Sequence, residues 1–284
     1  MTKLALQLYS VRNNMAKDPI GTIKRAAEIG YRYIEVANHD TRKDKGIGFG
    51  VSADKMNETL NECGVKVISA HLDPFDDLEE LCDYQKAIGN HNIVYSRDYY
   101  HCKEDVTRRA DWLNRTGEQA AKYGVVLHYH NHFHEFMKLP GCDKTIYEML
   151  VDGTDPALVK IQIDTFWAFR GGADPVKLIE ALGDRCTLVH QKDFTAGYEK
   201  EINLFDQVYP GEKIDRSTYD RIENPLTFTE PGSGIMDIQG IIDACNKNSR
   251  FEYIILEQDH TQMDELDSIR KSFDCFRKYK GIEL

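Results

Sequence analysis

The chain has 284 residues, of which 41% are hydrophobic, and a formal net charge of −11 at pH 7. This length and apolar content suffice to bury the core of one large domain. Because nucleic acids and anionic membranes attract basic surfaces, the acidic balance argues against both as partners. We find no secretory pattern, no run that approaches a membrane span and no Cys-x-x-Cys pair among the seven cysteines, and therefore expect a cytoplasmic protein with reduced thiols.

Short β-type runs alternate with helical patterns along the whole chain, which is typical of a parallel sheet built from βα units. We predict eight strands, at residues 4–9, 31–37, 65–71, 92–97, 125–131, 160–164, 187–193 and 252–259. Several of the helical stretches between them begin at Asp or Pro and end at Gly. Eight such units without a dividing linker predict one α/β domain over residues 1–284, a (β/α)8 TIM barrel.

One connection, at about residues 194–234, is much longer than the others. Loops of this length are uncommon unless they are functional. The segment carries five aromatic residues, Tyr198, Phe205, Tyr209, Tyr219 and Phe228. They could cover a ligand at the barrel mouth or dock a partner, or the segment could be a compact excursion packed on its own side chains. The sequence leaves these alternatives open.

The stretch LHYHNHFHEF, residues 127–136, repeats histidine at a spacing of two. Side chains alternate between the faces of a strand, and the odd-numbered Val125, Leu127 and Tyr129 are apolar, so they would face the helices. His128, His130 and His132 would then point into the barrel. We expect His130 and His132 near the carboxyl-terminal mouth, where barrel active sites lie. We expect His128, one layer deeper, and His134, beyond the strand, to be hydrogen-bonded structural groups.

The same alternation brings polar side chains from other strands to this mouth. In chain order they are Glu35, His71, Asp164, His190, Lys192, Glu257 and Asp259. Four candidates for metal ligands come from consecutive strands: His130, Asp164, His190 and Glu257. One inward histidine alone is more often a core residue, but together these groups offer the nitrogen and oxygen ligands that suit Mn²⁺, Co²⁺, Zn²⁺ or Fe²⁺.

Trp167 and the turn Arg170-Gly171-Gly172 follow closely after Asp164. They could form a wall of a substrate site. They could equally be a packed loop with a flexible corner, and the sequence does not separate the two interpretations.

Six segments, in order across nearly the whole chain, resemble the sugar phosphate isomerase/epimerase family, the xylose isomerase-like TIM barrels that include inosose dehydratases and ketose 3-epimerases. They are LQLYSVR, YHNHFHEF, IDTFWAFRGGADP, VHQKDF, EPGSGIMDIQGII and YIILEQDHT. The resemblance implies a polyhydroxylated carbonyl substrate and a divalent metal, commonly Mn²⁺, held by residues matching His130, Asp164, His190 and Glu257. Many relatives have Glu in place of His130, and in ketose epimerases that Glu is one of two opposed bases. The difference disfavours a two-carboxylate epimerase mechanism.

A metal that chelates adjacent carbonyl and hydroxyl oxygens acidifies the C–H bond between them and stabilises an enediolate. Glu257 or His132 is the candidate base, and Lys192 or Glu35 the candidate acid or oxyanion partner. The candidates for substrate contact are Glu35, His71, Trp167 and Arg170. Reprotonation of the enediolate gives isomerisation or epimerisation, whereas loss of a β-substituent gives elimination.

Our main hypothesis is therefore a metal-dependent isomerase or epimerase of a keto sugar or related polyol. The alternative is a lyase that dehydrates an inosose or eliminates the aglycone of a 3-keto glycoside, including a C-glycoside. An abasic-site nuclease is disfavoured by the acidic charge, and a non-enzymatic sugar-binding barrel is a fourth hypothesis. The absence of a Gly-rich phosphate loop favours an unphosphorylated sugar. Homo-oligomerisation and a small accessory subunit are left open.

Overall fold

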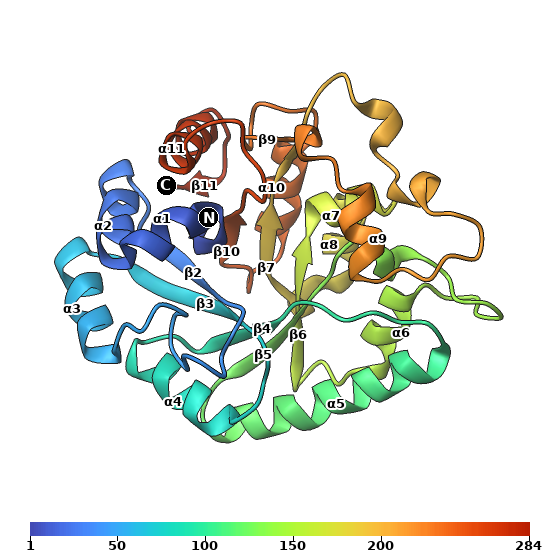
Figure 1. Cartoon of the computed structure of the whole chain (residues 1–284), viewed down its shortest axis with the longest axis horizontal. Helices are drawn as coiled ribbons and strands as arrows, with labels where there is room; N and C mark the ends of the chain where they lie inside the picture. The colour runs from blue at the N-terminus through green and yellow to red at the C-terminus, as the bar shows by residue number, and fades with distance from the viewer.

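The computed structural model describes residues 1–284 and contains a closed barrel of eight parallel strands (Figure 1). The strands are β1 (Thr2–Gln7), β2 (Tyr33–Asn38), β3 (Lys66–Leu72), β4 (Asn92–Tyr95), β5 (Val126–His130), β6 (Val159–Asp164), β7 (Cys186–Gln191) and β10 (Tyr253–Leu256). Each strand pairs with the next, and β10 closes the barrel on β1. The short β11 (Ile282–Glu283) also pairs with β1. The predicted (β/α)8 TIM barrel of a single domain is confirmed.

Helices surround the strands (Figure 1). They are α1 (Arg12–Lys17), α2 (Pro19–Ile29), α3 (Ala53–Cys63), α4 (Leu78–Ala87), α5 (Lys103–Lys122), α6 (Ile146–Gly153), α7 (Thr165–Arg170), α8 (Pro175–Leu182), α10 (Ile238–Lys247) and α11 (Glu265–Phe276). Their ends follow the local sequence, since Asp18 caps α2 and the left-handed Gly64 ends α3. None of them combines the length and the apolar character that crossing a membrane requires.

The apolar core forms two layers, as the alternation along the strands predicts. The larger layer lies between strands and helices and includes Leu127 and Tyr129 of β5. A small cluster of four residues from different strands packs separately: Ala5, Ile68, Leu188 and Ile255. The even-numbered His128 and His130 point inward, where they contact side chains of β7 and β6. Polar groups therefore gather on the same inner face as this small cluster, towards the ends of the strands.

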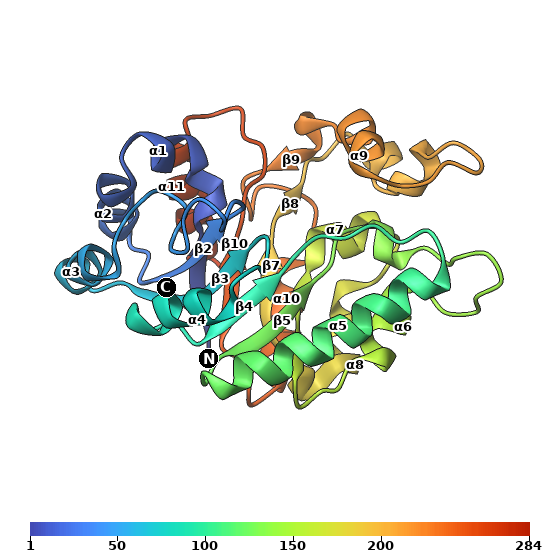
Figure 2. The same ribbon diagram turned by 60° about the horizontal axis from the view of Figure 1, so that its bottom comes forward.

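Residues 194–234 are not one long loop, which corrects the sequence prediction. The antiparallel pair β8 (Asp193–Phe194) and β9 (Phe228–Thr229) joins the two ends of the segment, and α9 (Arg216–Ile222) lies between them. Helix α9 escapes a search for apolar periodicity because it has only seven residues, RSTYDRI. Figure 2 shows α9 and β9 at the end of the barrel opposite the N-terminus.

The segment 194–234 packs on its own side chains and on the barrel mouth at once. A third apolar cluster combines Phe133, Phe166 and Trp167 of the barrel with residues of the segment, among them Leu204, Ile214, Tyr219, Ile222 and Phe228. Beneath it, the fully buried Arg170 donates hydrogen bonds to Thr227 Oγ1 at 3.1 Å and to the carbonyl of Glu201 at 3.0 Å. The segment is therefore a fixed wall of the barrel mouth.

Candidate active site at the carboxyl ends of the strands

A cavity of about 400 Å³ opens at the carboxyl ends of the strands, and only four of its 19 lining residues are hydrophobic. The strand ends and α7 contribute His71, His130, His132, Trp167, Lys192, Glu257 and Asp259. Other walls come from connecting loops, with Tyr9, His39, Asp73 and Arg97, and from α9 and the residue after it, with Arg216, Tyr219, Asp220 and Glu223. A concave polar site at this face of a TIM barrel is where catalysis is expected.

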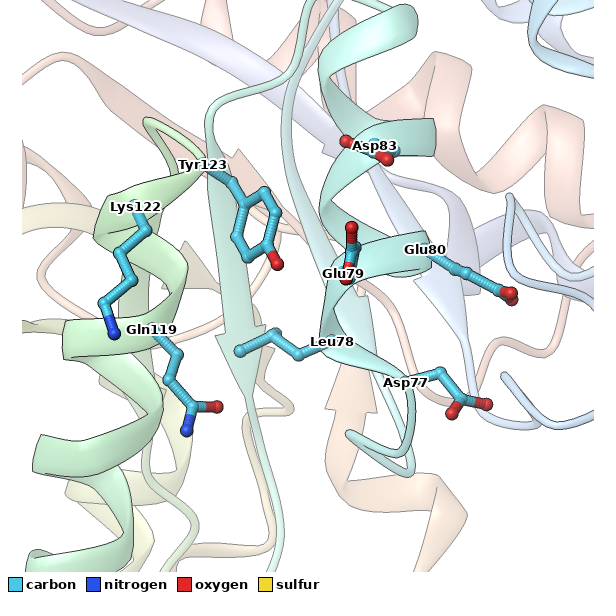
Figure 3. Close-up of a pocket in the computed structure, with 8 residues that line it drawn as sticks. All are labelled: Asp77, Leu78, Glu79, Glu80, Asp83, Gln119, Lys122 and Tyr123. Atoms are coloured by element: carbon cyan, nitrogen blue, oxygen red, sulfur yellow. The ribbon is translucent and has the colours of Figure 1, made fainter.

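A larger depression, of about 670 Å³, lies between the outer helices α4 and α5 (Figure 3). Acidic side chains of α4, such as Glu79 and Asp83, face Gln119 and Lys122 of α5 and Tyr123, which follows the helix. None of the candidate residues lines it. The cavity with the larger volume is therefore not the candidate active site. The convergence of polar groups identifies the cavity at the barrel mouth instead.

Lys192 joins three carboxylates in the floor of the cavity. Its Nζ lies 2.5 Å from Asp164 Oδ2, 2.6 Å from Glu257 Oε2 and 3.5 Å from Asp259 Oδ2. Burial alone would lower the pKa of Lys192, but the charges of these acids raise it well above its ordinary value. Lys192 is therefore a buried ammonium. The alternation of the strand predicts that it points inward, but not that it reaches Asp164.

His190 lies between two glutamates. Its Nδ1 is 2.7 Å from Glu257 Oε2, and its Nε2 contacts Glu35 Oε1. Burial would lower the pKa of His190, but the charges of Glu35 and Glu257 raise it to about 10. Burial would likewise raise the pKa of Glu35, yet His190 and His71 lower it to about 2. The imidazole is thus a charged link between two buried carboxylates.

Glu35 does not line the cavity, which corrects its assignment as a substrate-contacting residue. Its side chain is fully buried, and its carboxylate accepts hydrogen bonds from Gln7, Ser69, Gln162 and His190. The side chain of Glu35 points into the barrel, but it lies one layer below the cavity and so does not reach a ligand there. Its contacts make it a support for His190.

Gln162 connects two further histidines of the floor. Its Nε2 donates to Glu35 Oε2, so its Oε1 accepts from His71 Nε2 at 2.7 Å and from His130 Nδ1 at 2.8 Å. Burial lowers the pKa of His71 to about 4 and the pKa of His130 well below its ordinary value. Both imidazoles are neutral. With its proton on Nδ1, His130 turns the lone pair of Nε2 towards Asp164 Oδ2, 3.6 Å away.

Three of the four predicted metal ligands converge on one another. Asp164, His190 and Glu257 each offer a ligand atom, and these atoms lie within 4.8 Å of one another. His130 falls in a second group of this kind, with His71 and His190. The lone pair of His130 Nε2 and the carboxylate of Asp164 face each other with no proton between them. A cation bound between them would remove this repulsion. The donor set therefore fits a divalent ion, although Lys192 competes for the same carboxylates.

His132 is a further neutral imidazole that lines the cavity, beside His71 and His130. Its Nε2 accepts a long hydrogen bond, of 3.5 Å, from Arg97, and its buried Nδ1 has no partner. Burial first, and then the charge of Arg97, lower the pKa of His132 well below its ordinary value. Arg97 itself forms no ion pair with a carboxylate. Sequence reasoning missed it, because it lies in an irregular loop after β4 that has no periodic pattern.

Trp167 lines the cavity, whereas Arg170 does not. The indole of Trp167 lies 5.9 Å from the His132 ring and 5.7 Å from Lys192 Nζ. Arg170 points away from the cavity into the segment 194–234, which corrects its assignment to the substrate wall. The burial of Arg170 depends on how the segment 194–234 folds, which the periodicity of the sequence does not reveal.

The two remaining histidines of the repeat make structural hydrogen bonds. His128 Nε2 lies 3.1 Å from Thr187 Oγ1, one layer below the cavity. His134 is held by the Tyr219 hydroxyl and the carbonyl of Asp98, each at 2.7 Å. These contacts match the roles that we expected for both residues.

Asp259 lines the cavity beside Lys192, and the candidate assignments left it without a role. Burial raises the pKa of Asp259 to about 7, although the charge of Lys192 opposes this shift. The sequence did indicate that Asp259 points into the barrel, since it shares the inward face with Glu257. The residues of α9 carried no such signal, because their position depends on how the segment 194–234 folds.

Comparison with known proteins places the chain among related barrels. Residues 23–279 match the family model described as xylose isomerase-like TIM barrel. An inosose dehydratase of Lactiplantibacillus plantarum is 28% identical over 207 residues, which cover 66% of this chain and 64% of that protein. An inosose dehydratase of Mesomycoplasma hyopneumoniae is 23% identical and covers 90% of this chain and 86% of that protein. The chain thus spans slightly less than two thirds of the length of the first relative.

Two solved structures share the fold. A sugar phosphate isomerase/epimerase from Parabacteroides distasonis has a TM-score of 0.75 at 21% identity, covering 99% of this chain and 96% of that one. The IOLI protein, solved with a zinc atom, has a TM-score of 0.67 at 15% identity, covering 98% and 99%. The relatives are enzymes, in line with the expected enzyme. Because the family model covers most of its length, the chain belongs to the xylose isomerase-like TIM barrel family.

Proposed function

We propose that the protein is a metal-dependent lyase that acts on a polyhydroxylated carbonyl compound, such as an inosose or a 3-keto glycoside. It would remove a proton next to the carbonyl and expel a group from the β-carbon. One observation carries the proposal: a neutral imidazole, His132, and an ammonium, Lys192, line the same cavity, at 5.9 and 5.7 Å from the Trp167 ring. The dehydratase names of the relatives favour this alternative over the isomerase or epimerase.

His132 is the better of the two candidate bases. Glu257 Oε2 is occupied by His190 and Lys192, whose charges outweigh burial and lower the pKa of Glu257 well below its ordinary value. Both charged partners already hold this oxygen, so it suits ligand binding better than proton abstraction. His132 is neutral and lines the cavity, and its Nε2 lone pair accepts only a long hydrogen bond, of 3.5 Å, from Arg97, which a substrate proton would displace. We therefore assign proton abstraction to His132 and ligand binding to Glu257.

Lys192 and Asp259 are the candidate acids. As the C–H bond breaks at the α-carbon, its electron pair forms the new C=C bond while the bond from the β-carbon to the leaving oxygen breaks. Lys192 or Asp259 would protonate that oxygen, so that water or an alcohol leaves. Elimination of this type needs one base and one acid, whereas epimerisation needs two bases on opposite faces. The cavity provides the former pair.

The metal would be held by Asp164, His190 and Glu257, together with His130. The bound ion would act as a Lewis acid and stabilise negative charge on the substrate oxygens. Two observations support this ligand set: the convergence of the first three within 4.8 Å, and the zinc atom of a protein with the same fold. Mn²⁺ is the first ion to test, followed by Zn²⁺, Co²⁺ and Fe²⁺.

Proton NMR in D₂O tests the reaction. The protein is loaded with Mn²⁺ and incubated with ketoses, inososes and 3-keto glycosides, and each reaction is repeated after chelation. A metal-dependent enone, with release of water or aglycone, is the expected result. Deuterium in a rearranged sugar without any unsaturated product would instead establish an isomerase or epimerase. His132→Gln should abolish the product, and His128→Gln serves as the matched control because His128 does not line the cavity.

A further inference from the structure

A second cavity, of about 240 Å³, adjoins the proposed active site. It lies between the chain after β1 and the segment that follows β2. The two cavities share three lining residues, Tyr9, Ala37 and His39. The two cavities therefore meet along these residues, and a ligand that fills the first lies next to the second.

The two cavities differ in chemistry. Five of the ten residues that line the second cavity are hydrophobic, namely Leu8, Tyr9, Ala37, Ile47 and Phe49, against four of 19 in the first. The Tyr9 ring is fixed, because the guanidinium of Arg12 lies 4.3 Å above it and the His39 ring meets it edge-on at 5.5 Å. The first cavity is thus lined mainly by polar residues, whereas half of the residues that line the second cavity, beyond Tyr9, are apolar.

The wall formed by residues 38–50 is built in advance of any ligand. Asn38 Nδ2 donates to the carbonyls of Asp44 and Gly46, at 2.7 and 3.0 Å. The carboxylate of Asp44 in turn accepts from the backbone N–H groups of Gly46 and Gly50, both at 2.8 Å. Ile47 is buried in the main core and so anchors the middle of the segment. A preorganised wall lowers the entropic cost of binding.

A sugar or cyclitol ring gains little from such a wall, because its hydroxyl groups lose hydrogen bonds to water there. An aromatic ring gains from the removal of its apolar surface from water and from edge or face contacts with Tyr9 and Phe49. A cavity of about 150 Å³ holds benzene, so this one has room for a substituted ring. We propose that it is a subsite for an aromatic group attached to the polyhydroxylated substrate, which makes aryl glycosides the preferred substrate class.

This inference rests on the proposed function for its sugar half, and binding can be measured without turnover. Phenyl β-D-glucoside and methyl β-D-glucoside are titrated into the metal-free protein, with contacts located by saturation-transfer NMR. The phenyl compound should bind about tenfold more tightly, the gain expected from burying one ring, with saturation strongest on its aromatic protons. Equal affinity for the two glucosides would overturn the proposal.

Phe49→Ala tests the location of the subsite. It should remove most of the preference for the phenyl compound and leave the affinity for the methyl compound within about twofold, since only the phenyl ring would touch Phe49. Phe49→Leu, which keeps apolar volume, should have an intermediate effect and guards against misfolding. Leu226→Ala, at an exposed apolar residue elsewhere, is the control. Equal weakening of both ligands by Phe49→Ala would contradict the assignment.

Turnover separates this proposal from the function on which it rests. Binding of the phenyl compound that depends on Phe49, with no elimination from any 3-keto glycoside, would keep the subsite and reject the lyase. Elimination from 3-keto glycosides with no preference for an aryl leaving group would keep the lyase and reject the subsite.

Discussion

His190 Nε2 contacts the carboxylate of Glu35, a residue without exposed surface, while His190 Nδ1 faces Glu257. A carboxylate behind a metal-binding histidine fixes the ring and raises its basicity. We therefore expect Glu35→Gln to weaken metal affinity by about 10- to 100-fold. Competition against a chromophoric chelator measures the change. Unaltered affinity would remove Glu35 from any role in the metal site.

His190→Ala and Asp164→Ala should each strip the metal while the far-ultraviolet circular dichroism of the barrel persists. Both residues lie at strand ends, and neither belongs to the apolar core. Metal content after dialysis, measured by atomic absorption, is the test. His128→Ala should retain the ion at full stoichiometry, because His128 contacts Thr187 and lies outside both groups of candidate ligands. A full complement of metal in either site variant would exclude that residue as a ligand.

Lys192→Met should destabilise the metal-free protein by about 3 kcal/mol, because Asp164 and Glu257 would lose the ammonium that neutralises them. Added Mn²⁺ should restore more stability in this variant than in the wild type, since the ion and Lys192 compete for the same carboxylates. Thermal unfolding with and without the ion tests both statements. Equal stabilisation of both proteins by Mn²⁺ would show that Lys192 does not compete.

Glu230 provides a pH-dependent test of stability outside the cavity. It accepts from Thr261, Ser268 and Lys271, and these contacts outweigh burial and lower the pKa of Glu230 below its ordinary value of 4.5. An acid whose pKa is lowered in the folded state stabilises that state above its unfolded pKa, and the contribution is lost as the pH falls through the folded pKa.

Glu230→Gln should therefore lower the free energy of unfolding at neutral pH and have a smaller effect at pH values below 4.5. Urea unfolding at a series of pH values gives this difference directly. A difference that stays constant across the series would show that the ionised form of Glu230 contributes nothing.

Arg170→Ala should loosen the segment 194–234 and leave the barrel folded, because the variant loses the hydrogen bonds to Thr227 and Glu201. We expect a cost of about 2–4 kcal/mol, concentrated in this segment. Limited proteolysis reports it as faster cleavage within 194–234. Arg216→Ala, at an exposed ion pair with Asp220 of the same segment, should not change the cleavage rate. Protection equal to that of the wild type would show that Arg170 is dispensable there.

The strand pattern allowed the eight strands to be predicted, together with the inward face of those that carry the candidate residues. Alternation placed His130, Asp164, His190 and Glu257 at one mouth because the closed barrel makes inner and outer faces chemically different. The predicted strands ran past the observed ends of β4, β7 and β10, because polar residues such as Lys192 and Asp259 continue the alternation after sheet pairing has stopped.

Contacts between distant elements could not be predicted in this way. The depth of Glu35 depends on register and on its partners from β1, β3, β6 and β7, not on its own strand. The position of Arg97 depends on an irregular loop, and the direction of Arg170 depends on the fold of the segment 194–234. In each case the deciding neighbour lies far along the chain, where periodicity carries no information.

The pairing of β8 with β9 brings the entry and exit of the segment 194–234 together, since Asp193 lies opposite Thr229. The carboxylate of Asp193 reinforces the junction by accepting from the N–H groups of Gly232, Gly234 and Met236. Because the β8–β9 pair holds its two ends together, the segment can be lengthened, shortened or replaced without moving the strands that carry the acids and histidines. The barrel can thus diversify what it admits by exchanging this module, while the chemistry beneath it is inherited unchanged.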